Sequence, residues 1–171
     1  MSARYLSKSR YLAGRECAKR LWIETHRRDL VPPIDAATQA IFDQGHEVGE
    51  LARELFLGGV EIGRAQLDWQ AALAATQEAM RPAGGRVPLY EAAFEHAGAA
   101  CRVDILVPVL EEGAEAWDLY EVKSSSSAKE VNVEDVAFQT WVLRGAGVAL
   151  RRSHLVHLDS DYVREGDLDL A

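Results

Sequence analysis

The period of the hydrophobic pattern changes near residue 86, and this change constrains the fold more than any other feature of the sequence. Before it, apolar residues recur at helical spacings; after it, short apolar runs separated by turn residues are typical of strands. Strands are expected at 88–95, 100–109 and 116–123, followed by a helix at 133–143 and a last strand at 148–158. Tight turns make the first three strands an antiparallel meander, and a helical crossover makes the last strand parallel to its partner. The order β-β-β-α-β therefore predicts an α/β fold with a mixed central sheet flanked by helices.

Residues 1–85 are expected to be mainly helical. The expected elements are helices over 10–28 (with a break near Gly14), 36–57 and 69–80, and a short strand over 60–62. The expected N-caps are Ser7 or Ser9, Asp35 and Asp68, with Asn132 for the later helix. A stripe of apolar residues at helical spacing in the second helix is expected to be buried: Ile41, Val48, Leu51, Ala52 and Leu55.

The 171 residues have the length of one domain. It divides into the helical part, a core over 86–158 that carries the candidate catalytic residues, and a polar tail over 159–171. With 48% hydrophobic and 27% charged residues, the chain has a globular composition. No run approaches the ~18 apolar residues of a membrane span, and no apolar segment follows the basic N-terminus. We therefore expect a cytoplasmic protein with no membrane partner; the oligomeric state stays open.

Charge is distributed unevenly along the chain. The net charge is −8, but residues 1–28 carry eight basic and two acidic side chains, so this segment is +6 and the remainder −14. Such asymmetry is a reason to consider a polyanion partner, with Lys8, Arg10, Lys19 and Arg20 as candidate phosphate contacts. A solvated helix face is the ordinary explanation of the same pattern.

The chemistry-bearing residues lie in the second and third expected strands. Glu121 and Lys123 share one face of their strand because side chains alternate. Asp104 lies among apolar neighbours in the preceding strand, and the connecting turn makes it a candidate cross-strand neighbour of Glu121. A charged residue in a buried strand needs a partner or a cation.

Two carboxylates and a lysine on one sheet face suit metal-dependent phosphodiester hydrolysis. Mg²⁺ or Mn²⁺ prefers carboxylate oxygens, polarises a phosphate and lowers the pKa of bound water. The lysine can orient or deprotonate that water and offset transition-state charge. A surface Glu–Lys pair beside a buried salt bridge is the alternative, since E-x-K alone occurs by chance.

Two further residues join this pattern. His46 follows Gly45 in mid-helix, where glycine costs roughly 1 kcal/mol relative to alanine, so a close approach at this point is expected, and imidazole ligation would favour Mn²⁺. Gln139 lies on the helix after the third strand. Each has an ordinary explanation, as a helix histidine and a surface glutamine.

Together these residues resemble the RecB-like nuclease branch of the PD-(D/E)XK superfamily, which includes recombination nucleases, phage lambda exonuclease and the nucleases of CRISPR adaptation. The branch has a helical Gly-His element, a strand aspartate, a strand E-x-K and a helical Q-x-x-x-Y, in that order. The corresponding residues here are Gly45-His46, Asp104, Glu121-Val122-Lys123 and 139–143. The resemblance covers nearly the whole chain and is greatest to a bacterial family in which such a domain is joined to a longer C-terminal region.

The resemblance implies a restriction-endonuclease-like core and a role for each of these positions. His46, Asp104, Glu121 and the Val122 carbonyl would hold the metal, Lys123 would be catalytic, and Gln139 would position the DNA or the lysine. Glu91 would be a secondary acidic residue near the site. Ser124, in the loop that follows, could hydrogen-bond phosphate.

The chain departs from this pattern at two places. Leu143 stands where the branch has the tyrosine of Q-x-x-x-Y. Several relatives also carry a four-cysteine iron–sulfur cluster, of which Cys17 resembles the first ligand. The other three are absent, so no complete cluster can form from this chain alone. The acidic end of the sequence favours a chain truncated from a longer protein.

The sequence thus predicts a Mg²⁺- or Mn²⁺-dependent DNA nuclease, with exonuclease action on ends or single strands as the hypothesis. The alternative is a catalytically inactive nucleic-acid-binding or protein-interaction module on the same fold. An ATP-driven enzyme finds no support because no phosphate-binding Gly-x-x-x-x-Gly-Lys loop is present. A serine hydrolase lacks its Gly-x-Ser-x-Gly turn. Cleavage polarity, DNA versus RNA, strandedness and pathway are left open.

Overall fold

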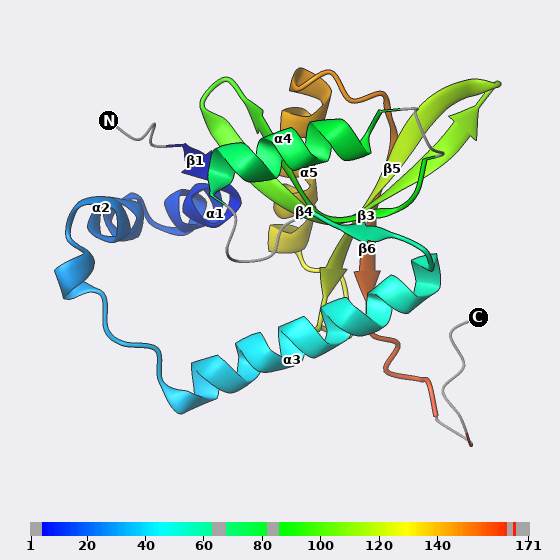
Figure 1. Cartoon of the computed structure of the whole chain (residues 1–171). Helices are drawn as coiled ribbons and strands as arrows, with labels where there is room; N and C mark the ends of the chain where they lie inside the picture. Colours follow the sequence, from blue (N-terminus) through cyan, green and yellow to red (C-terminus); the bar gives the residue numbers. More distant parts are fainter. Residues whose placement is uncertain (1–4, 63–67, 82–85, 164–165, 167–171) are drawn as a thin grey trace.

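The computed structural model describes residues 5–62, 68–81, 86–163 and 166. Its elements follow the order β1 (Leu6–Ser7), α1 (Lys8–Glu16), α2 (Ala18–His26), η1 (Arg28–Leu30), α3 (Ala36–Arg53), η2 (Glu54–Phe56), β2 (Val60–Glu61), α4 (Trp69–Ala79), β3 (Leu89–His96), β4 (Ala99–Glu111), β5 (Ala114–Lys123), α5 (Glu130–Gly145) and β6 (Leu150–His157) (Figure 1). Of the expected tail, only residues 159–163 and 166 lie in the described part.

The strands form one mixed six-stranded sheet, which confirms the predicted α/β class. Its order is β2-β3-β4-β5-β6, and β1 pairs with β4. The meander β3-β4-β5 is antiparallel, and β6 is parallel to β5 across the α5 crossover, as predicted. The two-residue strands β1 and β2 run parallel to β4 and β3; of these, only β2 was expected.

Both meander turns are two-residue turns with left-handed backbone. Ala97 and Gly98 have φ of 47° and 80°, and Glu112 and Gly113 have 51° and 82°. Positive φ at both central positions is typical of the type I′ turn, whose twist matches that of paired strands. The tight turns predicted between the first three strands are therefore confirmed, and the second of them fixes the register of β4 against β5.

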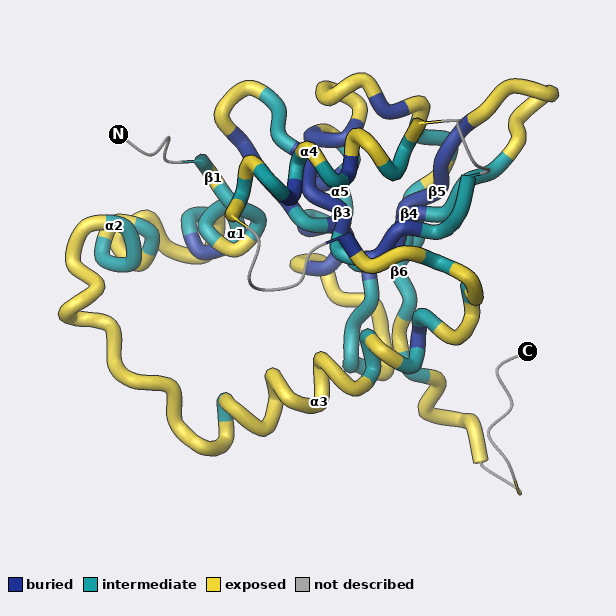
Figure 2. Tube along the Cα trace, viewed as in Figure 1, coloured by how far each residue is buried: buried dark blue, intermediate teal, exposed yellow. Residues whose placement is uncertain are grey.

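The sheet is covered on both faces. On one face, Phe138, Val142 and Leu143 of α5 pack into the large core with Leu106 and Leu119. On the other face, the end of α3 and η2 contribute Ala52 and Phe56 to a smaller cluster around the side chains of Tyr90, Ile105 and Tyr120. Figure 2 shows the central strands buried between these layers.

The N-terminal segment docks against β4. β1 pairs with Ala99 and Ala100, on the edge of β4 that β5 occupies further along. Ser7 accepts a hydrogen bond from the Arg10 amide and is the N-cap of α1, as predicted. The structure therefore carries Lys8, the first residue of α1, to the end of β5.

The predicted helix over 10–28 breaks at Cys17 and not at Gly14. Cys17 is extended, with φ −159° and ψ 115°, and separates α1 from α2. A Cβ at Gly14 would lie 2.9 Å from Leu21 Cδ2. The glycine therefore allows α1 and α2 to pack closely, and it does not end a helix.

Two further sequence expectations are wrong. The stripe expected to be buried is buried only at Ala52. Ile41 is exposed because the first half of α3 packs against little of the described chain (Figure 2), and Leu55, which lies in η2, is exposed as well. α5 begins at Glu130 with Lys129 as its N-cap, so Asn132 lies inside the first turn and is buried. The caps Asp35 and Asp68 are confirmed. No helix in the described part is long and apolar enough to cross a membrane.

Candidate active site

The two central strands lose their alternation at one level of the sheet. In β4, Cys101 and Val103 belong to the large core, but the next residue that does so is Leu106. In β3 the same skip separates Leu89 from Ala92. The skipped level holds Glu91 and Asp104, between the paired residues Tyr90–Ile105 and Ala92–Val103. Glu91 has a φ of 57°, which is strained for a non-glycine residue.

Asp104 therefore lies where the regular ladder is interrupted. It immediately precedes Ile105, the partner of Tyr120, so its register position is opposite Glu121. Its carboxylate accepts a hydrogen bond of 2.8 Å from the Val122 amide. Desolvation, together with the negative charge of Glu121, raises the pKa of Asp104 to about 7. Asp104 is thus held beside the E-x-K strand, and the positive charge of Lys8 does not offset the effects that raise its pKa.

Glu121 is buried, with 1% of its surface exposed, and both of its oxygens are bonded. Oε1 accepts from Lys8 at 2.8 Å and from Lys123 at 2.5 Å, and Oε2 accepts from Gln139 at 2.7 Å. Burial alone would raise the pKa of Glu121, but the two ammonium groups outweigh it and lower the pKa to about 2. Glu121 is therefore a permanent anion in this arrangement.

Asp135 joins this cluster, although no role for it was predicted from the sequence. It accepts from Lys123 at 2.6 Å and from Gln139 at 3.0 Å. The sequence contained a signal for this role: Asp135 and Gln139 are four residues apart on a helix face that also buries Phe138 and Val142. A buried polar pair on an apolar helix face needs a polar partner across the interface.

Lys123 is an ammonium ion and not a ready base in this arrangement. Burial lowers its pKa, but the charges of Glu121 and Asp135 outweigh this effect, so the pKa is raised. Burial likewise lowers the pKa of Lys8, but the neighbouring carboxylates outweigh this effect and raise it. The geometry therefore favours charge stabilisation and orientation by Lys123 over deprotonation of water.

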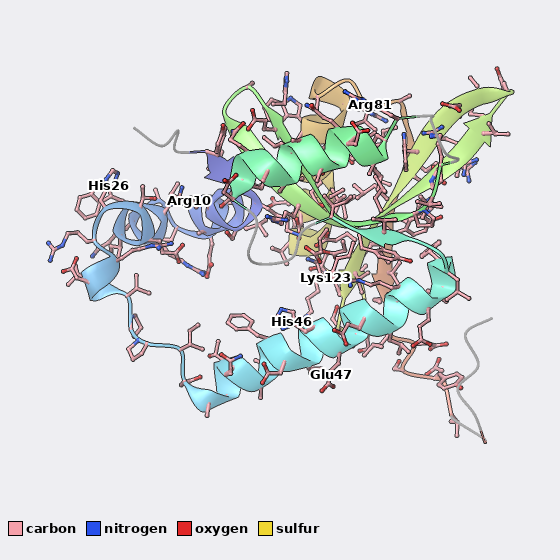
Figure 3. All side chains as sticks on the ribbon, in the orientation of Figure 1. Arg10, His26, His46, Glu47, Arg81 and Lys123 are labelled. Atoms are coloured by element: carbon pink, nitrogen blue, oxygen red, sulfur yellow. The ribbon has the colours of Figure 1, made fainter. Side chains whose placement is uncertain are left out.

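The cluster opens into a cavity of about 970 Å³ between α3 and the sheet. Its lining includes the side chains predicted for the site: His46, Glu91, Asp104, Glu121, Val122 and Lys123, with Lys8 beside them. Figure 3 shows His46 on the side of α3 that faces the sheet and Glu47 on the opposite side. Among the residues that the structure describes, nothing lies within 4 Å of a Cβ built on Gly45, so the close approach expected there is not found in this part of the chain.

The residues around the cavity fit a hard cation by donor type, but they do not form a complete ligand set as placed. Among the described residues, no group of three or more His, Cys, Asp or Glu side chains is positioned to hold a metal ion. Glu121 has no unbonded oxygen, because its cationic and amide neighbours use both. Lysine side chains would have to withdraw from it for ligation.

Asp104 carries the case for a cation. It can be compared with Asp118, a buried carboxylate on β5 that Arg151 binds through two nitrogens and whose pKa is lowered. Within the described chain, no ammonium or guanidinium group lies at ion-pair distance from Asp104. An acid with a raised pKa and no paired cation, beside a second carboxylate, is a site that a divalent ion would stabilise.

The basic residues predicted to contact nucleic acid differ in whether other residues of the chain already bind their charged groups. Arg20 of α2 is held in ion pairs by Glu16, at the end of α1, and by Glu24. Arg10 donates to the Tyr5 carbonyl, and Lys8 belongs to the site itself. Lys19 is exposed, and Ser124 is partly exposed directly after Lys123. The solvated-face explanation therefore holds for Arg20. Cys17 is exposed and Cys101 buried, so the two thiols do not share a site.

No protein-family model, curated protein or solved structure matches the chain. The candidate function therefore depends on the geometry of the site itself.

Proposed function

We propose that the chain is a metal-dependent phosphodiesterase of the PD-(D/E)XK type, with a restriction-endonuclease-like core, that hydrolyses DNA as an exonuclease. One observation carries the proposal: Asp104 and Glu121 lie on neighbouring strands where regular pairing stops, and Lys123 lies beside them in the same cavity. The mixed sheet and the helix that places Gln139 against Glu121 support it.

In this proposal Asp104, Glu121, the Val122 carbonyl and His46 would hold Mg²⁺ or Mn²⁺. When bound, such an ion supplies Lewis-acid stabilisation of the phosphate and a water of lowered pKa. Lys123, kept cationic by Asp135, places positive charge where the phosphorane develops negative charge. Gln139 bridges Glu121 and Asp135 and so keeps the carboxylate oriented.

A cleavage assay tests this function. DNA labelled at the 5′ or the 3′ end, single- or double-stranded, would be incubated with Mg²⁺ or Mn²⁺. We expect stepwise loss from an end, and a fall of roughly 100-fold or more in rate for Asp104→Asn and Lys123→Met. Lys129→Met, an exposed lysine outside the cavity, is the matched control and should cleave like the unmodified protein. Equal rates in all four proteins would remove the site assignment.

A second function has one observation in its favour. Glu121, Lys8, Lys123, Asp135 and Gln139 form a closed network that neutralises its own charges, as a structural ion cluster would. An inactive binding module on the same fold would have this property. It predicts no heat of Mn²⁺ binding in calorimetry, together with no cleavage of any labelled substrate.

A further inference from the structure

A second cavity meets the candidate active site at Asp104. It has a volume of about 750 Å³ and lies between the N-terminal segment and β4. It shares Lys8, Glu91, Arg102 and Asp104 with the first cavity. Its remaining lining includes Tyr5, Arg10, Arg28 and Trp69. A chain molecule in the first cavity can therefore continue past Asp104 into the second.

Arg102 stands at the junction of the two cavities and forms no ion pair within the described chain. It precedes Asp104 by two residues in β4 and is partly buried. Its Nη1 is shielded from solvent and has no hydrogen-bond partner among the described residues. Within the described chain no carboxylate lies at ion-pair distance from it, including Glu91 and Asp104, which face the same cavities. Its one directed contact is with the Trp69 ring, whose centroid is 5.6 Å from the guanidinium carbon.

A guanidinium nitrogen that is shielded from solvent and has no acceptor is costly to the fold. Other arginines of the chain show the usual solution: Arg151 is bonded to Asp118, and Arg86 covers Trp117 but also donates to the Ala116 carbonyl. Arg102 has the ring contact without the acceptor. The fork of a guanidinium matches phosphate oxygens, and an arginine left without an acceptor is suited to bind one.

The neighbouring side chains favour an anion at this point. Within the described chain, the Arg10 side chain donates one hydrogen bond, to the Tyr5 carbonyl, and Arg28 has no ion pair. Of the acids that face the second cavity, Glu24 is paired with Arg20. Arginine therefore predominates on the side of the cavity that lies away from Asp104.

We propose that Arg102 binds a phosphate group of the nucleic acid, adjacent to the phosphate that is cleaved. The inference rests on the proposed function for the identity of the ligand. The bound strand crosses Asp104 from one cavity into the other, with Arg102 as its anchor on the far side. The phosphate is either a terminal 5′-phosphate or an internal phosphodiester.

Binding in EDTA, where no cleavage occurs, tests this site. Fluorescence anisotropy would be measured with a labelled single-stranded oligonucleotide that ends in a 5′-phosphate or a 5′-hydroxyl. For Arg102→Met we expect roughly 10- to 100-fold weaker binding. The salt slope should also fall by about 0.7, because one fewer phosphate is neutralised on a single strand. Arg102→Lys, which keeps the charge but not the fork, should fall between the two. Arg86→Met, which also removes an arginine from a tryptophan ring, should bind normally.

The outcomes separate the possibilities. A loss confined to the 5′-phosphorylated oligonucleotide assigns Arg102 to a terminal phosphate, and an equal loss with both assigns it to an internal one. Unchanged affinity of Arg102→Met for both, with an unchanged melting temperature, overturns the inference. Binding that depends on Arg102 in a protein that cleaves no DNA with either metal would retain the phosphate site and reject the nuclease.

Discussion

Asp104 and Asp118 are carboxylates on neighbouring strands that differ in what neutralises them. Asp118 has the Arg151 guanidinium and the Arg152 amide, and its pKa is lowered. Asp104 has one amide, and burial raises its pKa. The difference has opposite consequences for stability, which makes the pair a test of whether Asp104 lacks a counter-charge.

The pKa of Asp104 rises from 3.8 to about 7 on folding. Between these values the folded chain keeps a proton that the unfolded chain releases, so stability falls as pH rises through this window. Asp104→Asn removes this penalty. We expect a melting temperature roughly 3 °C or more above that of the unmodified protein near pH 8 without divalent ions, and a smaller gain near pH 5.

Asp118→Asn is the control of opposite sign. Its lowered pKa contributes stability that is present above the unfolded pKa and is lost as pH falls through the folded pKa. The variant should therefore melt below the unmodified protein near neutral pH. Calorimetric scans would be run near pH 5 and near pH 8. A melting temperature of Asp104→Asn below that of the unmodified protein near pH 8 would contradict the assignment.

Residues that share a strand, or strands joined by a tight turn, could be predicted from the sequence. The alternation of side chains predicted that Glu121 and Lys123 share one face of their strand. The turn that sets the register predicted that Asp104 lies beside Glu121. Lys8 was predicted only as a candidate phosphate contact, because nothing local indicates that it binds Glu121, 113 residues away. Asp135 needed the orientation of α5 on the sheet, which periodicity does not supply.

At the scale of elements, α4 closes the open edge of β3 beyond β2. The Ala93 amide donates to Thr76 Oγ1 at 2.9 Å, and that hydroxyl donates to the Ala72 carbonyl at 2.9 Å. Both groups are buried. A helix hydroxyl thus accepts the hydrogen bond that a neighbouring strand would otherwise accept. This bond anchors β3 to α4 two residues after Glu91 and so supports the position of Glu91.

Thr76→Val keeps the shape of the side chain and leaves the Ala93 amide without an acceptor. We expect a loss of about 1–3 kcal/mol in the free energy of unfolding. Urea denaturation should show a lower midpoint with an unchanged slope. Thr76→Ser retains the hydroxyl and should lose less; equal losses in both variants would mean that packing, and not this hydrogen bond, holds α4 to the edge.

Elements with strong local signals were predicted well, and elements that depend on remote contacts were not. The meander, its two turns, the parallel last strand and the caps Asp35 and Asp68 follow from residues close in sequence. The two-residue strand β1 has no periodicity of its own and forms because β4 offers an unpaired edge. The stripe of α3 has helical spacing without a surface to bury it, so pattern alone overestimated its burial.

Considered whole, the molecule assembles the charged network of its candidate site from three separate parts of the chain, and α3 adds His46 to the cavity beside it. The N-terminal segment supplies Lys8, the central strands supply the carboxylates and Lys123, and α5 supplies Asp135 and Gln139 (Figure 1). The positive N-terminal segment and the acidic remainder thus meet at this point. In the proposed nuclease, a divalent ion and the two ammonium groups compete for Glu121.

This competition predicts how metal changes stability. A ligand that binds only the folded state at 100 times its Kd adds about 2.7 kcal/mol, which for a domain of this size is a rise of roughly 5–10 °C in melting temperature. We expect such a rise with Mn²⁺ for the unmodified protein, and little rise for Asp104→Asn or Glu121→Gln.

Lys8→Met releases one bond to Glu121 Oε1, so it should melt lower than the unmodified protein without metal and show the larger rise with Mn²⁺. Lys129→Met, which removes an exposed lysine outside the cluster, should behave as the unmodified protein. If Mn²⁺ raised the melting temperature of Asp104→Asn as much as that of the unmodified protein, the ion would be binding elsewhere and the three parts of the chain would be held together by their own charges alone.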